Sequence, residues 1–298
     1  MYDLTVIILT HNRPSLVIET IKSVLNQEYK DFNFIVSDNS DNNETYLTII
    51  QNNLLDRLHY IKRNNLSSLD HFNINLDEVN TKYFVLFHDD DIMLPQMIGS
   101  LHEEILRDDS IVAVGCNSFD LIGSKLVKRK KSWFKSNILL ERPDSLILQQ
   151  ISGHFVFLPS YIYNADIIKQ QKIKFGNLAG KYSDIVWLLE IQKHGKIIWL
   201  SKPLMLYRIH KEQDSAAFSY KNQQLLVNYF SKFMSNGEKN RKLKKYRIMN
   251  LSIAMRLRLK VRRKMSPFIL GQLIFLIRNF KFIYFSKCCF VLVKYVLF

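Results

Sequence analysis

Three adjacent carboxylates, Asp89, Asp90 and Asp91, follow closely on the apolar run Tyr83–Phe87. Neighbouring like charges repel, and each raises the pKa of the others. A divalent cation removes this conflict, and hard oxygen ligands suit Mg²⁺ or Mn²⁺. The alternative is an acidic turn in which Asp91 caps a helix that begins near Pro95. Because a cap needs only one such residue, the cluster predicts a metal site at the end of a buried strand.

The elements before this cluster alternate between strand and helix patterns. Apolar, β-branched runs predict strands, and stretches with a repeat of three to four residues predict helices of about 10–15 residues. This alternation is typical of βαβ units and a parallel sheet. Parallel strands bring their carboxyl ends to one edge, so the polar clusters that follow them are expected to converge. The strands are expected at 6–9, 32–36, 58–61 and 83–88, and the clusters at 10–13, 38–41, 63–65 and 88–91.

The order of elements is less regular after residue 110. A helix is expected after Ser183 and Asp184, and an exposed basic hairpin or loop at 126–133. Further strands are expected at 111–116, 155–158, 196–200 and 205–210.

The net charge of +15 lies entirely in the last part of the chain. Residues 237–298 hold 16 Lys/Arg and one acid, whereas residues 1–236 hold 26 basic and 26 acidic residues. The best candidate for a domain boundary is therefore near Asn236 and Gly237. The first half contains neither a dinucleotide-binding glycine fingerprint nor a P-loop. Three cysteines and an N-terminus unlike a signal peptide favour a cytoplasmic protein.

The basic tail has the pattern of an amphipathic helix, because cations surround Tyr246, Met249, Ile253 and Leu257. Its longest uncharged run, Met265–Ile277, has 13 residues and is too short to span a bilayer. Such a segment suits the interface of an anionic membrane. A helix that packs in a core or an oligomer is the alternative.

Taken together, these segments resemble the family-2 glycosyltransferases of the GT-A fold, nucleotide-sugar-dependent enzymes of bacterial surface polysaccharide synthesis such as capsule and lipopolysaccharide. Each matching piece is weak alone, but together they follow the family's order. They are 6–13, 35–40, 63–65, the cluster 88–91 with Pro95, 183–184 and 207–210. The acidic cluster coincides with the family's D-x-D motif.

The resemblance implies an α/β fold, a GT-A Rossmann-like mixed sheet flanked by helices, followed by a basic apolar helical tail. Residues 1–236 would form the catalytic domain, with a nucleotide-binding half at 1–110 and an acceptor-binding half at 111–236. Residues 237–298 would form the membrane-associating region, and the protein would be peripheral on the inner face of the cell membrane.

For the donor, the resemblance implies a bound Mn²⁺ or Mg²⁺ that stabilises the charge developing on the leaving diphosphate. The candidate metal ligands are Asp89, Asp90, Asp91 and His210. Asp89 is also the candidate for the ribose, because in the family the first acid often contacts the ribose and a later one binds the metal. His88 stands where many members carry an acid, so the register of the metal ligands stays open. Asp38 would accept the ring N–H of uracil or thymine; its alternative is an Asx turn. The same pocket would be lined by Thr10, Asn12, Arg13 and Asn65.

Asp184 matches the position of the catalytic base, which removes the proton of an acceptor hydroxyl. It can also cap the helix that follows. The family has Glu-Asp here, where this chain has Ser183 and Asp184. Arg208 and Lys211 are candidates for diphosphate contacts, and a structural role is the alternative for His210.

The resulting expectation is an inverting glycosyltransferase that transfers a sugar from a nucleotide donor, UDP-linked by preference, to a lipid-linked or growing glycan. A nucleic-acid-binding protein is one alternative, because the tail is basic and aromatic, although its apolar runs argue against it. A nucleotidyltransferase is the other, but residues 10–14 lack the glycine-rich phosphate loop that it needs.

Overall fold

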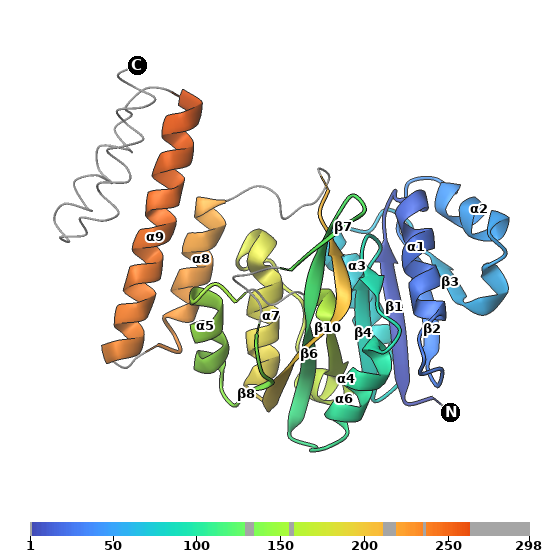
Figure 1. Cartoon of the computed structure of the whole chain (residues 1–298), viewed down its shortest axis with the longest axis horizontal. Helices are drawn as coiled ribbons and strands as arrows, with labels where there is room; N and C mark the ends of the chain where they lie inside the picture. Colours follow the sequence, from blue (N-terminus) through green and yellow to red (C-terminus); the bar gives the residue numbers. More distant parts are fainter. Residues whose placement is uncertain (1, 129–133, 155–157, 211–218, 235–236, 263–298) are drawn as a thin grey trace. The chain divides into compact units, whose positions relative to one another are not determined.

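The structure, a computed structural model, describes residues 2–128, 134–154, 158–210, 219–234 and 237–262, with only the backbone for 255–262. The chain divides into two compact units (Figure 1). The first comprises Met1–Asn177 with Ser183–Gln213, and the second Leu178–Tyr182 with Asp214–Phe298. The boundary expected near residue 236, and the two halves of the catalytic domain, stay predictions.

The first unit is built on one mixed sheet in which β1, β2, β3 and β4 are parallel, as the alternating pattern predicts. The strand order is β3-β2-β1-β4-β9-β6-β10-β5, with β7 paired to β6 and β8 to β10. Strands β5, β7, β8 and β9 run antiparallel to their neighbours. The strands are β1 (Leu4–Thr10), β2 (Asn33–Asp38), β3 (His59–Lys62), β4 (Tyr83–His88), β5 (Ile92–Met93), β6 (Ile111–Ile122), β7 (Lys125–Lys128), β8 (Ile138–Leu140), β9 (Tyr161–Asn164) and β10 (Lys196–Arg208).

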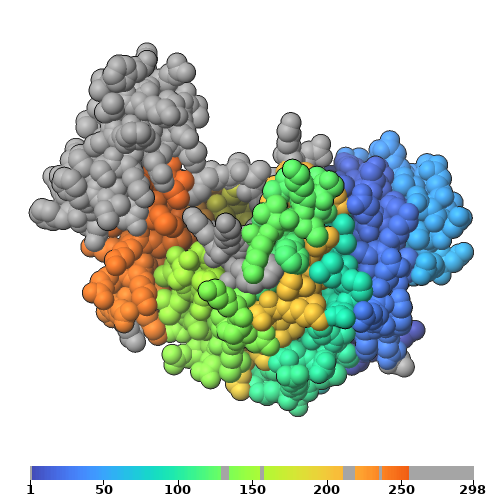
Figure 2. All heavy atoms as spheres, viewed as in Figure 1, coloured from blue at the N-terminus to red at the C-terminus, as the bar shows by residue number. Residues whose placement is uncertain are grey.

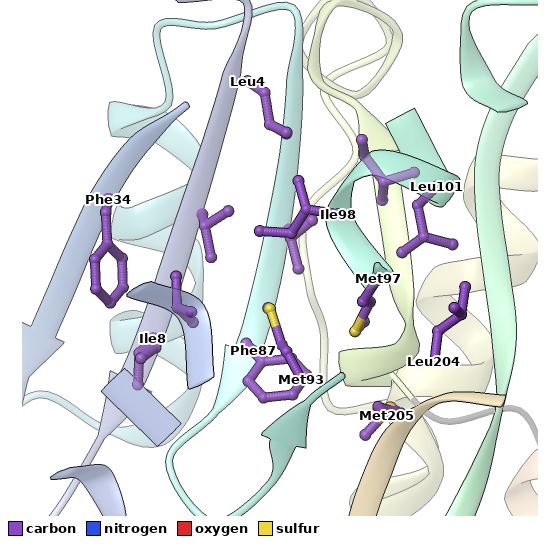
Figure 3. Close-up of a cluster of buried hydrophobic side chains, with 14 of the residues drawn as sticks. Leu4, Ile8, Phe34, Phe87, Met93, Met97, Ile98, Leu101, Leu204 and Met205 are labelled. Atoms are coloured by element: carbon purple, nitrogen blue, oxygen red, sulfur yellow. The ribbon is translucent and has the colours of Figure 1, made fainter. Parts of the chain in front are cut away.

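Helices cover both faces of this sheet (Figure 1). On one face, α1 and α4 bury apolar side chains against β1 and β4, and Figure 3 shows part of this core, with Ile8, Phe87 and Leu101 among the labelled residues. On the other face Phe84 stacks on Tyr163, which packs on Trp187 of α7. The helices of the first unit are α1 (Pro14–Leu25), α2 (Glu44–Gln51), α3 (Ser68–Glu78), α4 (Met97–Ile105), α5 (Pro143–Ile151), α6 (Ala165–Gln170) and α7 (Ser183–Gln192).

The position of β4 in the middle of the sheet explains why its sequence is apolar without interruption. Successive side chains point to opposite faces of a sheet, and both faces of this one are covered. All residues from Tyr83 to Phe87 are buried. The predicted doubly buried strand before the acidic cluster is therefore confirmed.

The strand expected at 155–158 falls largely outside the described residues, and one other expectation for the second half of the chain was wrong. Leu158 lies in a short 3₁₀ turn (Leu158–Ser160), and the strand there is β9; residues 155–157 lie outside the described part. The two strands expected at 196–200 and 205–210 are one strand, β10, with register shifts on either side of Pro203. Proline has no N–H to donate to a neighbouring strand, so the hydrogen-bond register is irregular at this point. In the sequence, the proline therefore looks like the end of one strand and the start of another.

The second unit contains α8 (Tyr220–Phe230) and α9 (Gly237–Arg262). Apolar residues of α9, including Leu243, Tyr246 and Leu251, are buried. The hydroxyl of Tyr246 donates to Oε1 of Gln223 on α8 at 3.3 Å. This part of the basic tail thus packs as a helix, whereas 263–298, where most of the expected membrane contact falls, lies outside the described residues. Among the helices of the described residues, none combines the length and apolarity needed to cross a bilayer.

Candidate active site

The strand register brings the predicted polar clusters to one edge of the sheet. Thr10 pairs with Asp38, and Leu9 with His88, so that β1, β2 and β4 end side by side. Asp38 in turn pairs with Lys62 at the end of β3. The predicted convergence of the strand-end clusters is therefore confirmed.

Asp89 is held by three donors that come from the end of β1 and the loop that follows it. Its Oδ2 accepts from Oγ1 of Thr10 at 2.9 Å and from the backbone N–H of His11 at 3.3 Å. Its Oδ1 accepts from Nη1 of Arg13 at 2.9 Å. Burial raises the pKa of this carboxyl and the Arg13 charge opposes that rise. Thr10 at the end of β1 and Arg13 before α1 therefore fix Asp89 in place.

Asp90 and Asp91 lie in different surroundings. Oδ2 of Asp90 accepts from Nη1 of Arg13 at 3.1 Å and lies 2.9 Å from Nε2 of His210. Oδ1 of Asp91 accepts from the backbone N–H of Arg208 at 2.9 Å, but its Oδ2 is buried and has no hydrogen-bond partner among the described residues. Burial, then the charge of Asp90, raises the pKa of Asp91 well above its usual range. A buried carboxylate oxygen without a donor is costly unless a cation occupies the site.

His88, Asp90 and Asp91 present a set of donor atoms suited to a divalent cation. One donor atom from each lies within 4.8 Å of the others. Carboxylate oxygens suit Mn²⁺ or Mg²⁺, and an imidazole nitrogen favours Mn²⁺ of the two. Sequence reasoning did not select His88 as a ligand; its position directly before the acids, as the last residue of β4, was the available signal. Asp89 lies outside this group.

Arg208 is engaged in supporting the acidic loop, Asp89–Asp91. Its Nε donates to the backbone oxygen of Asp90 at 2.8 Å, and its Nη2 forms an ion pair with Glu19. The diphosphate role expected for Arg208 stays a prediction. Lys211, its expected partner in that role, lies outside the described residues.

Thr20 also supports the acidic loop, a role that was not predicted. Its hydroxyl lies 3.0 Å from the backbone oxygen of Asp89 and 2.7 Å from that of Asp91. It reaches both from the buried face of α1, where a threonine has the pattern of an ordinary core residue. One side chain thus ties both ends of the loop to a helix.

Replacing Thr20 by valine is expected to lower the free energy of unfolding by about 1–3 kcal/mol, because it leaves buried carbonyls without their donor. Donor turnover should fall with it, since the loop carries the candidate ligands. Denaturant unfolding and turnover assays measure the two effects. Thr20→Ser keeps the hydroxyl and is the matched control; equal losses in both variants would contradict a hydrogen-bonding role.

Asp38, the candidate for base recognition, is fully buried. Its Oδ1 accepts from the backbone N–H of Ser40 at 2.8 Å, which is the Asx turn considered as the alternative. Its Oδ2 accepts from the hydroxyl of Tyr60 at 2.6 Å and from Nζ of Lys62 at 3.4 Å. Burial, then the bond to Asp38, raises the pKa of Tyr60. These partners from β3 were not predicted.

Asn12 and Asn65 both have left-handed backbones, with φ of 54° and 50°. Asparagine tolerates this conformation better than most residues, so each marks a tight turn after a strand. The Asn12 side chain exchanges hydrogen bonds with Asp41, donating at 2.6 Å to its carboxylate and accepting at 3.0 Å from its N–H. It thereby joins the loops after β1 and β2. Asn65 is exposed.

Asp184 lies in the first turn of α7, and its Oδ1 accepts from the N–H of Ile185 at 2.8 Å. Burial raises its pKa to about 6. Burial and then the charge of Asp184 raise the pKa of Tyr163 on β9. A carboxylate with a raised pKa is a stronger base than an exposed one and is still ionised at neutral pH.

If Asp184 is the base, it must be ionised to act. We therefore expect kcat/KM to fall about tenfold per pH unit below pH 6, because the protonated fraction grows as pH drops below the raised pKa. A pH profile of transfer between pH 4.5 and 8, with protein stability followed in parallel, measures this limb. A flat profile across pH 6 in folded protein would argue against Asp184 as base.

Known proteins share both the sequence pattern and the fold. The sequence model described as glycosyl transferase family 2 matches residues 5–165. An uncharacterized glycosyltransferase of Haemophilus influenzae is 24% identical over 227 residues, covering 74% of this chain and 69% of the relative. A GalNAc(5)-diNAcBac-PP-undecaprenol beta-1,3-glucosyltransferase of Campylobacter jejuni is 26% identical over 228 residues, covering 74% and 70%.

Two solved structures share the fold at low identity. S. aureus TarS 1-349 in complex with UDP-GlcNAc has a TM-score of 0.66 and 17% identity, covering 92% of this chain and 80% of that one. The mannosyltransferase PcManGT of Pyrobaculum calidifontis, in complex with GDP-Man and Mn²⁺, has a TM-score of 0.58 and 13% identity, covering 98% and 87%. The expected GT-A fold is confirmed. Because the family's sequence model matches more than half of its length, the chain belongs to glycosyl transferase family 2.

Proposed function

We propose that this chain is an inverting, metal-dependent glycosyltransferase. It transfers a sugar from a nucleotide-diphosphate donor, for which we favour UDP, to a hydroxyl of a lipid-linked or growing surface glycan. The observation that carries the proposal is the acidic loop at the carboxyl edge of the sheet, where a buried oxygen of Asp91 has no hydrogen-bond partner in the part of the chain that the structure describes. Support for the donor comes from TarS, which was solved with UDP-GlcNAc. Support for the acceptor comes from the Campylobacter jejuni relative, named for an undecaprenol-linked substrate.

The residues fit a divalent cation held by His88, Asp90 and Asp91. When bound, Mn²⁺ or Mg²⁺ would supply positive charge against the diphosphate as it leaves. Arg13 lies between Asp89 and Asp90, so its charge separates these two carboxylates. His210 touches Asp90 and orients it, and the ligand role expected for His210 stays part of the proposal. With Asp89 outside the donor group, we keep it for the ribose.

For transfer, the acceptor hydroxyl gives its proton to Asp184 as its oxygen attacks the anomeric carbon. The new C–O bond forms as the bond to the diphosphate oxygen breaks, and that bond's electron pair leaves with the diphosphate. A single displacement of this kind inverts the configuration at the anomeric carbon. Asp184 then holds the proton and releases it to solvent before the next transfer.

Base recognition by Asp38 requires a small rearrangement. A carboxylate has about four acceptor positions, so Asp38 can accept a ring N–H in addition to its present donors. Because it is fully buried, one neighbour must move to admit the base. We favour Lys62, whose side chain is 28% exposed and whose 3.4 Å contact is the longest of the three. Thr10, Asn12 and Asn65 would line the approach.

A donor screen tests the proposed function. Purified full-length chain with Mn²⁺ is incubated with UDP-, GDP-, dTDP- and CMP-linked sugars, and release of the free nucleotide is measured with and without lipid-linked acceptor. We expect release of UDP from at least one UDP-sugar, stimulated by acceptor. Nucleotide release that never exceeds that of a heat-inactivated sample, for any donor, would contradict the proposal.

The location is also a proposal. The basic tail and the lipid-linked acceptor are consistent with a peripheral protein on the inner, cytoplasmic face of the cell membrane, where nucleotide sugars are present. Residues 263–298 carry most of the apolar sequence on which the tail's membrane role depends.

A further inference from the structure

The β6–β7 hairpin exposes apolar side chains that the glycosyltransferase chemistry does not use. Its tip, residues 122–128, turns at Gly123, whose φ of +60° suits glycine. Every residue of the tip is exposed, and the fractions for the large apolar ones are 48% for Ile122, 57% for Leu126 and 42% for Val127. Figure 2 shows this hairpin in green on the surface of the face viewed.

Ile122 pairs with Lys125, so Ile122 and Val127 lie on one face of the hairpin and Leu126 lies on the other. Both faces of the tip therefore expose apolar side chains to water, which is unfavourable. The tip includes β7, which pairs with β6 and lies outside the main order of strands in the sheet. Such a strand is commonly protected by charge. Here the protection consists of cations alone, since Lys125 and Lys128 flank the two apolar residues of β7.

The sequence around the tip is strongly cationic. Between Asp120 and Glu141 there are six Lys/Arg and no acid. Apolar side chains set among cations are typical of protein segments that lie in the interface of an anionic bilayer. A nucleic acid would match the charge but would leave Leu126 and Val127 facing water, so the lipid surface fits both features.

Backbone pairing between β6 and β10 also connects the hairpin tip to the acidic loop. Leu121, at the base of the hairpin, pairs with Arg208, and its carbonyl accepts from the N–H of Ile209 at 2.9 Å. The backbone N–H of Arg208 donates to Asp91. The tip therefore begins one residue beyond the point where β10 holds the acidic loop, and it extends from the same edge of the sheet.

We propose that the hairpin tip, residues 122–128, inserts its apolar side chains into the interface of an anionic membrane and so holds the acidic loop at the lipid surface. This surface is distinct from the basic tail and belongs to the first unit. The proposal rests on the proposed transfer to a lipid-linked acceptor. Insertion of the tip would bring the acidic loop close to the membrane surface, where the sugar of such an acceptor lies.

A position-specific probe tests the insertion directly. In the full chain with C288S and C289S, leaving only the buried Cys116, L126C is labelled with the environment-sensitive dye NBD. Vesicles of phosphatidylglycerol and phosphatidylcholine are added, and pure phosphatidylcholine vesicles serve for comparison. We expect a blue shift and brighter emission with anionic vesicles, and quenching by lipids that carry a quencher in their acyl chains. L47C on α2, a leucine that is 52% exposed, is the matched control and should not respond.

Several results would overturn the proposal. If the labelled protein co-sediments with anionic vesicles while the L126C probe stays in water, another surface binds the membrane. If it does not bind anionic vesicles at all, no insertion occurs. A blue shift without vesicles that grows with protein concentration would assign the tip to a second copy of the chain.

Charge reversal separates this proposal from the proposed function. K125E/K128E should weaken binding to anionic vesicles by about fivefold or more, since each cation contributes to binding at a charged surface. Release of UDP from the donor without vesicles should be unchanged. If the unaltered chain releases no UDP from any donor, the proposed function alone is refuted. If the reversal leaves vesicle binding unchanged, the hairpin's role alone is refuted.

Discussion

Replacing Asp90 by alanine is expected to lower kcat for sugar transfer by about 10²–10³-fold, the usual cost of losing one group that stabilises developing charge. Asp90 is the residue on which the interactions of the acidic loop converge. Its carboxylate meets Arg13 and His210, its backbone oxygen meets Arg208, and it belongs to the donor group with His88. The substitution removes a candidate metal ligand and takes away a carboxylate that pairs with Arg13.

The expected loss is measured as UDP release at saturating donor, over a range of Mn²⁺ concentrations. Added Mn²⁺ should restore little of the rate, since a ligand is missing. Asp109→Ala is the control, because the side chain of Asp109 is 99% exposed and lies between α4 and β6. If Asp90→Ala and Asp109→Ala turn over equally fast, the acidic loop has no part in the reaction.

Replacing Asp184 by asparagine is expected to lower the rate of transfer by about 10²–10⁴-fold, the contribution typical of general base catalysis. The side chain keeps its shape and can still accept from the N–H of Ile185, so the start of α7 should stay folded. What it loses is the ability to take a proton from the acceptor hydroxyl. Binding of UDP, measured by calorimetry, should be unchanged.

Glu190→Gln is the matched control for Asp184→Asn, because it makes the same chemical change on the same helix, where Glu190 pairs with Lys193. It should leave transfer intact. The acid limb near pH 6 should be present in the control. Transfer by Asp184→Asn at the rate of the unaltered chain would remove Asp184 from the reaction.

The first part of the fold could be predicted from local sequence because its elements have clear periods. The strand β4 is apolar throughout, and α1 has a regular apolar face. The second half could not be predicted as well. The sequence around Pro203 resembles a chain break, yet long-range pairing with β6 carries the strand through it.

The same distinction applies to the candidate site. The acidic loop is visible in the sequence because three acids stand together. The contacts of Thr20 with the loop join residues 69 and 71 positions apart, and that of Tyr60 with Asp38 spans 22. Such contacts depend on how strands and helices are brought together, and an apolar helix face or a strand gives no local sign of them. His88 differs from these residues because it stands next to the acids in the sequence. To predict it as a ligand, only the direction of its side chain relative to the acids had to be known.

The central claim, that the acidic loop and His88 bind a divalent cation needed for the nucleotide, is tested most directly by Mn²⁺ binding. Electron paramagnetic resonance of free Mn²⁺, titrated against the full chain with and without UDP, gives the affinity without any turnover. We predict binding that UDP strengthens, that is lost in Asp90→Ala, and that is weakened about tenfold or more in His88→Ala. Mn²⁺ that stays free in the presence of UDP, or binds equally well to all three chains, would contradict the account.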